Sequence, residues 1–249
     1  MCDLCFPRVV AEPAAAVVGG TTKTVPRARK STRPAGGRTP TVRGSGAAAK
    51  VPPFASRRLY HVTPLTNLES ILLDGAIKPI ASGIDPDIDI AAPLVRQLRA
   101  HRDVGDGRHV DEFVPFAVSP EAERWVELQE GAEEPHWSQA ARALGPSDYA
   151  VLVAVGRDLG TDLVVADGDA GAAPTRFTVG ETAPAIARAA HFDPEFSAVE
   201  VLVAQEVPVS SLTLIAVANE PARAKVRRMF QDVDGTAPKV VVHPPWFGA

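Results

Sequence analysis

From about residue 57 onward, apolar and polar positions alternate in short blocks that predict both strands and helices. Runs rich in β-branched and aromatic residues predict strands at 59–62, 113–118, 149–155, 163–166, 199–203, 212–217 and 239–242. Helical spacing predicts helices at 67–74, 91–102, 137–144 and 220–230. Thr63 is placed to cap the first helix and Gly75 to end it. Strands dominate the second half, so the pattern predicts an α+β domain.

The first 56 residues lack this periodicity and consist mainly of Ala, Gly, Pro, Thr and Arg. Such a segment buries too little apolar surface to offset its conformational entropy, so we expect a disordered tail at 1–56 and one folded domain at 57–249. The tail has nine basic and two acidic side chains, a charge of +7, which leaves −11 for the domain. The tail either attracts phosphate backbones or is a solubilising spacer. An acidic domain needs this tail, or a local basic groove, to bind DNA.

Composition also excludes several classes of protein. No apolar run approaches the ~20 residues of a membrane-spanning helix, and Asp3 and Pro7 break the order of a signal peptide. We therefore expect a cytoplasmic protein with no membrane partner. Cys2 and Cys5 are too close for a stabilising disulfide and lack the further ligands that zinc requires, so we expect no metal.

Several short motifs over residues 57–247 occur in the order that is typical of one enzyme family. They are Tyr60-His61-Val62-Thr63, Asn67-Leu68 with Ile71-Leu72 and Gly75, Phe113-Val114-Pro115-Phe116, Asp167-Gly168-Asp169-Ala170, Thr175-Arg176-Phe177, Glu200-Val201-Leu202-Val203, Val207-Pro208, and the stretch at 240–247. In this order they resemble the DarT-like DNA ADP-ribosyltransferases. The resemblance implies a split β-sheet core with flanking helices, preceded here by the disordered basic tail.

The same resemblance implies an activity and partners. Members of the family use NAD+ as co-substrate to place ADP-ribose on a base of single-stranded DNA, here with thymine expected and guanine as the alternative. They are usually toxins that a macrodomain antitoxin counters. Two other functions stay open: the same fold and co-substrate with a protein or RNA end as acceptor, or a non-enzymatic nucleic-acid-binding protein.

Cleavage of the nicotinamide bond of NAD+ develops positive charge on the ribose, which a nearby carboxylate stabilises. Glu200 is the candidate, because a carboxylate at the start of an apolar strand is costly unless it reaches a cleft or a partner. An exposed strand face is the alternative reading, and Glu206 is the second candidate.

The resemblance also implies residues that contact NAD+. His61 would bind the nicotinamide ribose, with Thr63 and Asn67 as further contacts, unless these are structural or turn residues. An arginine after the first helix would clamp the pyrophosphate and assist catalysis, because a guanidinium binds such groups bidentately. Arg96 is the first choice for both roles, Arg99 the second for the co-substrate, and Arg102 is also eligible. An exposed basic helix face is the alternative reading for each of them.

Base recognition would involve the segment before the glutamate strand. Asp167, Asp169 and Thr175 surround a turn that would shape the nucleobase pocket, or else form a tight surface connection. Phe192 would stack on a base, with core packing as the alternative.

Overall fold

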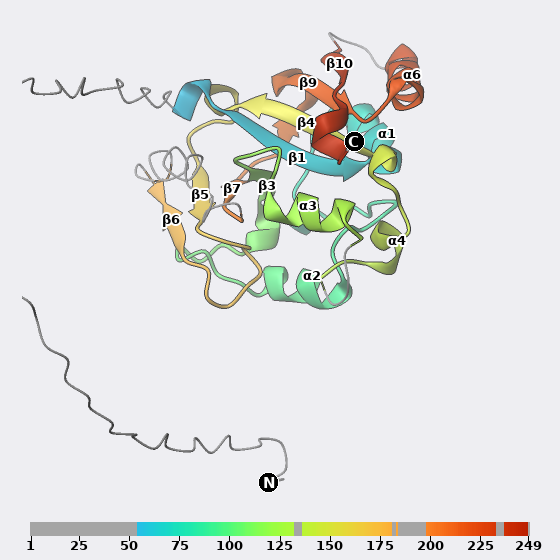
Figure 1. Ribbon diagram of the computed structural model, residues 1–249. Helices are drawn as coiled ribbons and strands as arrows, with labels where there is room; N and C mark the ends of the chain where they lie inside the picture. The colour runs from blue at the N-terminus through green and yellow to red at the C-terminus, as the bar shows by residue number, and fades with distance from the viewer. Residues whose placement is uncertain (1–53, 132–135, 181–182, 184–197, 233–236, 249) are drawn as a thin grey trace, which may run out of the picture. The chain divides into compact units, whose positions relative to one another are not determined.

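The structure, a computed structural model, describes residues 54–131, 136–180, 183, 198–232 and 237–248. The predicted tail at 1–56 lies almost entirely outside these residues, so the domain boundary stays a prediction. Within the described chain the central element is an eight-stranded sheet in the order β10-β9-β4-β1-β3-β7-β5-β6, accompanied by the short pair β2-β8 (Figure 1).

The strands are mostly antiparallel, and β10 runs parallel to β9. Their bounds are β1 Arg58–Pro64, β2 Ala76–Ile77, β3 Val114–Ala117, β4 Tyr149–Val155, β5 Leu163–Ala166, β6 Phe177–Val179, β7 Glu200–Val203, β8 Val207–Pro208, β9 Leu212–Val217 and β10 Lys239–Val242. The helices are α1 Leu65–Asp74, α2 Pro93–Ala100, α3 Glu123–Gln129, α4 Gln139–Arg142 and α6 Glu220–Met229.

The predicted α+β class is confirmed, and the predicted strands at 149–155, 163–166, 212–217 and 239–242 have the bounds of β4, β5, β9 and β10. The α2 and α4 helices are shorter than predicted, and the pattern missed α3 and β6. The prediction that Thr63 caps the first helix is wrong. Thr63 is buried within β1, and Pro64 precedes the helix without a side-chain cap. Gly75 ends α1 as predicted, in the left-handed conformation with φ 74°.

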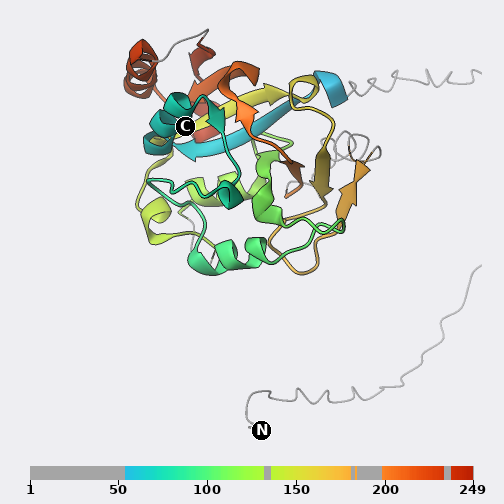
Figure 2. The same cartoon turned by 180° about the vertical axis from the view of Figure 1, so that it is seen from behind.

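Apolar side chains alternate across the sheet and form a core on each face. On one face Leu68 of α1 and Val226 of α6 pack against strand residues such as Leu152. On the other face Trp125 of α3 packs with Val151. Figures 1 and 2 show α1 and α6 together on one side and α3 on the other. Full burial of each large side chain contributes roughly 1.5–3 kcal/mol, so the cores fix the sheet between its helices.

The sheet is split between β1 and β3. β1 pairs with β4 along its whole length, and β3 does the same with β7. Within the described chain, however, β1 and β3 pair at one position only, Tyr60 with Ala117. Beyond that position the two strands diverge, so two well-paired halves meet at a single point. This agrees with the split core that the family resemblance implies.

Candidate active site

A cavity of about 530 Å³ lies where the sheet is split. His61 and Thr63 of β1 line it from one half of the sheet, and Pro115 of β3 and Glu200 of β7 line it from the other. Residues of α1, α2 and α3 complete the wall. The volume falls within the range of about 300–1,000 Å³ typical of small-molecule sites, and polar groups converge on it from elements far apart in sequence.

Glu200 is the first residue of β7, and its side chain is 16% exposed. The guanidinium of Arg99 donates to both of its carboxylate oxygens, from Nη1 to Oε1 at 3.2 Å and from Nη2 to Oε2 at 2.9 Å. The backbone N–H of Ala170 donates to Oε1 at 3.1 Å. Three donors therefore hold the carboxylate in one orientation at the cavity wall.

Arg99 lies in the last turn of α2 and connects two acidic residues. Besides Glu200 it lies 3.6 Å from Oδ1 of Asp169. Burial alone would lower the pKa of the guanidinium, but the carboxylates of Glu200 and Asp169 outweigh burial and raise it. Arg99 therefore stays charged and keeps its bidentate contact.

Asp169 joins this pair to α3. Arg124 of α3 donates to Asp169 Oδ2 and, at 2.9 Å, to Glu127, and it also contacts the ring of His136. Burial would raise the pKa of Asp169, but the Gly171 N–H and the two arginines hold it below its ordinary value. The result is a continuous chain of charges from Glu127 through Arg124, Asp169 and Arg99 to Glu200.

His61 lies across the split from this chain of charges. Its Nδ1 lies 2.9 Å from the carbonyl oxygen of Pro115, and the ring packs against Phe116 with centroids 5.6 Å apart. Burial lowers the pKa of His61, and the bond to Pro115 offsets this only in part, so the ring is neutral near pH 7. A carbonyl oxygen only accepts, so Nδ1 carries the hydrogen and Nε2 is an acceptor.

The three arginines that the sequence could not separate have three different partners. Arg96 contacts Asp89, with Nη2 and Oδ2 2.6 Å apart, and it lines the cavity. Arg99 binds Glu200. Arg102 donates to the carbonyl oxygens of residues 173 and 175 at 3.0 and 2.7 Å, and so holds the segment that precedes β6.

The other predicted site residues have varied surroundings. Thr63 is buried at the cavity wall. Asn67 donates to the carbonyl of Ile88 at 2.8 Å and accepts from its N–H at 2.9 Å, so both ends of its amide are engaged. Asp167 accepts the Arg176 N–H at 2.7 Å.

Thr175 is buried and donates its hydroxyl hydrogen to the backbone oxygen of Asp169 at 2.6 Å. This bond closes the turn that presents Asp169 to the arginines. Phe192 lies outside the described residues, so its predicted contact with a base is untested.

Among the residues of the cavity wall that were not predicted from the sequence, Arg124 and Trp137 have polar groups that bear on its chemistry. The indole Nε1 of Trp137 is buried and, among the described residues, has no hydrogen-bond partner. A buried donor without a partner costs about 1–3 kcal/mol, and one at a cavity wall suits a ligand acceptor. No local pattern marks either residue, because both reach the cavity through tertiary packing.

The split sheet, with Glu200 and His61 at one cavity, agrees with the arrangement that the sequence resemblance implies for an ADP-ribosyltransferase, and the pairing of Glu200 with Arg99 is a finding of the structure. Comparison with known families agrees. The family model described as "ssDNA thymidine ADP-ribosyltransferase, DarT" matches residues 60–248, and the chain belongs to this family. The predicted family and the predicted class of enzyme are therefore confirmed.

Solved structures of the family have the same fold. The DarT of Thermus sp. 2.9 in complex with ADP-ribosylated ssDNA is 20% identical, with a TM-score of 0.65 over 77% of this chain and 96% of that one. The same protein in complex with NAD+ gives 20% identity and a TM-score of 0.60, over 77% and 98%. Thermosipho africanus DarTG in complex with ADP-ribose is 18% identical, with a TM-score of 0.60 over 77% of this chain and 51% of that one. No curated protein sequence matches the chain.

None of the helices in the described part of the chain is long and apolar enough to cross a membrane. No group of three or more His, Cys, Asp or Glu side chains among the described residues is arranged to hold a metal ion, and Cys2 and Cys5 lie outside these residues.

Proposed function

We propose that this chain transfers ADP-ribose from NAD+ to thymidine in single-stranded DNA. The observation that carries the proposal is the Glu200–Arg99 pair at the wall of a cavity in the split sheet, in a chain of the DarT family. The related Thermus protein has been solved with NAD+ and with ADP-ribosylated ssDNA, which supports the same two substrates here.

Transfer breaks the bond between nicotinamide and ribose and joins the ribose carbon to the base, which gives up a proton. Positive charge develops on the ribose as the first bond breaks, and a carboxylate that is already oriented stabilises it without further reorganisation. Glu200 takes this role. Arg99 is the catalytic arginine in place of Arg96, because Arg99 holds the glutamate and Arg96 is bound to Asp89.

The cavity offers NAD+ hydrogen-bonding groups of both kinds. Nε2 of His61 accepts, the hydroxyl of Thr63 accepts and donates, and the indole N–H of Trp137 donates. Arg96 lines the cavity while paired with Asp89, and its guanidinium is the proposed contact for the pyrophosphate. Asn67 acts indirectly, since it fixes the backbone of Ile88 in the cavity wall.

The acceptor base is recognised by the turn at 167–175. Asp169 reaches the cavity, and Asp167 and Thr175 shape the turn through their bonds to its backbone. Phe192 is kept as a proposed stacking contact.

The cellular setting follows from the substrates. Both NAD+ and single-stranded DNA are available in the cytoplasm, so we place the protein there. The DarTG match supports a toxin whose antitoxin, of macrodomain type, removes the ADP-ribose.

The test is incubation of the purified chain with NAD+ and thymidine-containing single strands, followed by mass spectrometry for an added ADP-ribose. The variants are Glu200→Gln and, as a matched control on an exposed carboxylate, Glu206→Gln. We expect an adduct with wild type and with the control, and none with Glu200→Gln.

Single strands that contain guanine but lack thymidine distinguish the two possible acceptor bases. An adduct on these strands would identify guanine as the acceptor. Slow cleavage of NAD+ without a DNA adduct would indicate a protein or RNA acceptor. If the chain neither forms an adduct nor binds NAD+, the result would indicate a non-enzymatic nucleic-acid-binding protein.

A further inference from the structure

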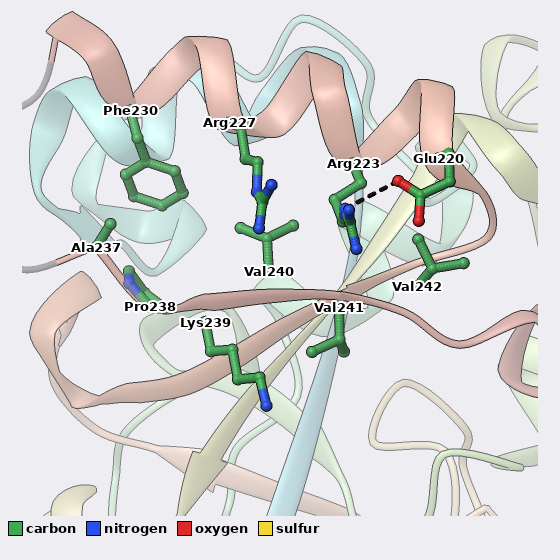
Figure 3. A pocket seen from close by; sticks show the side chains of 10 residues that line it. All are labelled: Glu220, Arg223, Arg227, Phe230, Ala237, Pro238, Lys239, Val240, Val241 and Val242. Atoms are coloured by element: carbon green, nitrogen blue, oxygen red, sulfur yellow. Dashed lines mark ion pairs between the residues drawn. The ribbon is translucent and has the colours of Figure 1, made fainter.

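A second hollow lies away from the split, along the outer edge of β10. It has a volume of about 590 Å³ and lies between β10 and α6. β10 is the end strand of the sheet, so one of its edges has no partner strand within the described residues. Figure 3 shows Arg223 and Arg227 extending from α6 toward β10, and Lys239 extending from the opposite side of the same strand. Positive side chains therefore flank this edge on both sides.

The charge of this hollow differs from that of the rest of the domain. Residues 220–242 hold five basic and three acidic side chains, whereas the remainder of 57–249 carries −13. Glu220 lines the hollow but forms an ion pair of 3.0 Å with Arg223. Arg227 and Lys239 are exposed, and neither has a carboxylate partner among the described residues. Two positive charges are thus available to an anionic ligand.

An aromatic ring accompanies these charges. Phe230 follows the last turn of α6, is half-buried, and faces the hollow beside Ala237 in Figure 3. A positive groove with an aromatic face is the combination that holds single-stranded nucleic acid, because phosphates follow the charges and bases stack on the ring. The partially exposed Val242 adds an apolar surface on the side of β10 that faces α6.

The hollow is suitably placed for a strand that also enters the active site. β10 is separated from β1, whose His61 and Thr63 line the catalytic cavity, by three strand spacings, about 14 Å at roughly 4.8 Å each. α1 packs beside α6, and its residues Ser70 and Ile71 line the catalytic cavity (Figures 1 and 2). The two hollows are therefore lined by two adjacent helices, the catalytic cavity by α1 and the second hollow by α6.

From these observations we infer that the α6–β10 groove binds the phosphate backbone of the single-stranded DNA substrate at a point outside the catalytic cavity. This inference rests on the proposed function for the identity of the ligand. It gives the acidic domain the local positive surface that DNA binding requires. Backbone contacts carry no sequence information, so the groove contributes affinity and leaves the choice of base to the catalytic cavity.

The test is a titration of fluorescent oligothymidylates by anisotropy, without NAD+ so that no transfer occurs. The variant is Arg227→Gln with Lys239→Gln. The matched control is Lys225→Gln with Arg228→Gln. It also removes two positive charges, both from positions of α6 that do not line the groove. Strands of about four and about sixteen nucleotides span the site sizes of comparable single-strand binding folds.

We expect the groove variant to weaken binding of the long strand and to leave the short strand unchanged. The slope of log affinity against log salt should fall in magnitude by about 1.4, at roughly 0.7 for each lost phosphate contact. The control should follow the wild type. All variants keep the basic residues of 1–56, so differences between them do not arise there.

Three outcomes would overturn the inference. Equal losses in the groove variant and the control would show a general charge effect. Unchanged DNA binding together with self-association of the groove variant would show that these charges only protect an exposed strand edge. Unchanged DNA binding with lost binding of polyglutamate would show that the groove takes an acidic polypeptide. Since the titration contains no NAD+, failure of the proposed transfer activity would leave its result interpretable.

Discussion

Replacement of Arg99 by lysine tests the central contact of the site. The substitution keeps the positive charge but removes the planar fork that donates to both oxygens of Glu200, at 3.2 and 2.9 Å. A lysine reaches one oxygen at most, so at least one charge-assisted hydrogen bond is lost, which costs roughly 1.5–3 kcal/mol. Both side chains are less than one-fifth exposed, so water does not readily replace the lost donor.

If Glu200 must be oriented during transfer, the rate of a single turnover at saturating NAD+ should fall about 10- to 150-fold, at roughly 1.4 kcal/mol per factor of ten. Arg108→Lys is the matched control, because Arg108 also donates to both oxygens of one carboxylate, that of Asp162, but does not line the cavity. Thermal melting checks that each variant is folded. A wild-type rate in Arg99→Lys, or an equal loss in the control, would refute the proposed role of Arg99.

Three further outcomes are expected. Arg124→Gln removes the contact of α3 with Asp169 and should lower kcat about 2- to 12-fold, for roughly 0.5–1.5 kcal/mol. Arg108→Gln is the control, since Arg108 has the same 31% side-chain exposure, and it should leave kcat unchanged. Equal effects of the two variants would contradict the proposed chain of charges. Trp137→Phe removes the unpartnered indole donor and should raise the KM for NAD+ about 2- to 12-fold with little change in kcat. Initial rates measure both constants, and an unchanged KM would contradict a hydrogen bond from this indole to NAD+. Burial lowers the pKa of His61 from its ordinary value of 6.5, so as the pH falls through that value the unfolded chain binds a proton that the folded chain does not, and stability should fall. Urea melts should show a weaker pH dependence in His61→Gln, and an identical dependence would contradict a buried neutral ring.

Much of the fold is readable from local sequence. β4 and β5 were predicted residue for residue because continuous apolar runs of β-branched residues suit strands that are buried on both faces. The end of α1 was predicted because glycine readily adopts the left-handed conformation found at Gly75. The strand β6 was missed, since three residues give too little periodicity to distinguish a strand from a loop, and the helix α3 was missed as well.

The split of the sheet has a different basis. It arises because β1 and β3 pair at Tyr60 and Ala117 and then diverge, and strand pairing of this kind is set by how the two halves pack on their helices. Only the family resemblance indicated it from the sequence.

The sequence by itself determined that Glu200 is the carboxylate to examine, because a charge at the start of an apolar strand requires a partner. It did not determine which partner. Arg96, Arg99 and Arg102 recur every three residues, so their local surroundings are nearly equivalent. The tertiary structure decides among them, because α2 packs so that Arg99 meets a strand 101 residues away. Arg124 joins the same site through α3, and contacts of such separation leave no local pattern.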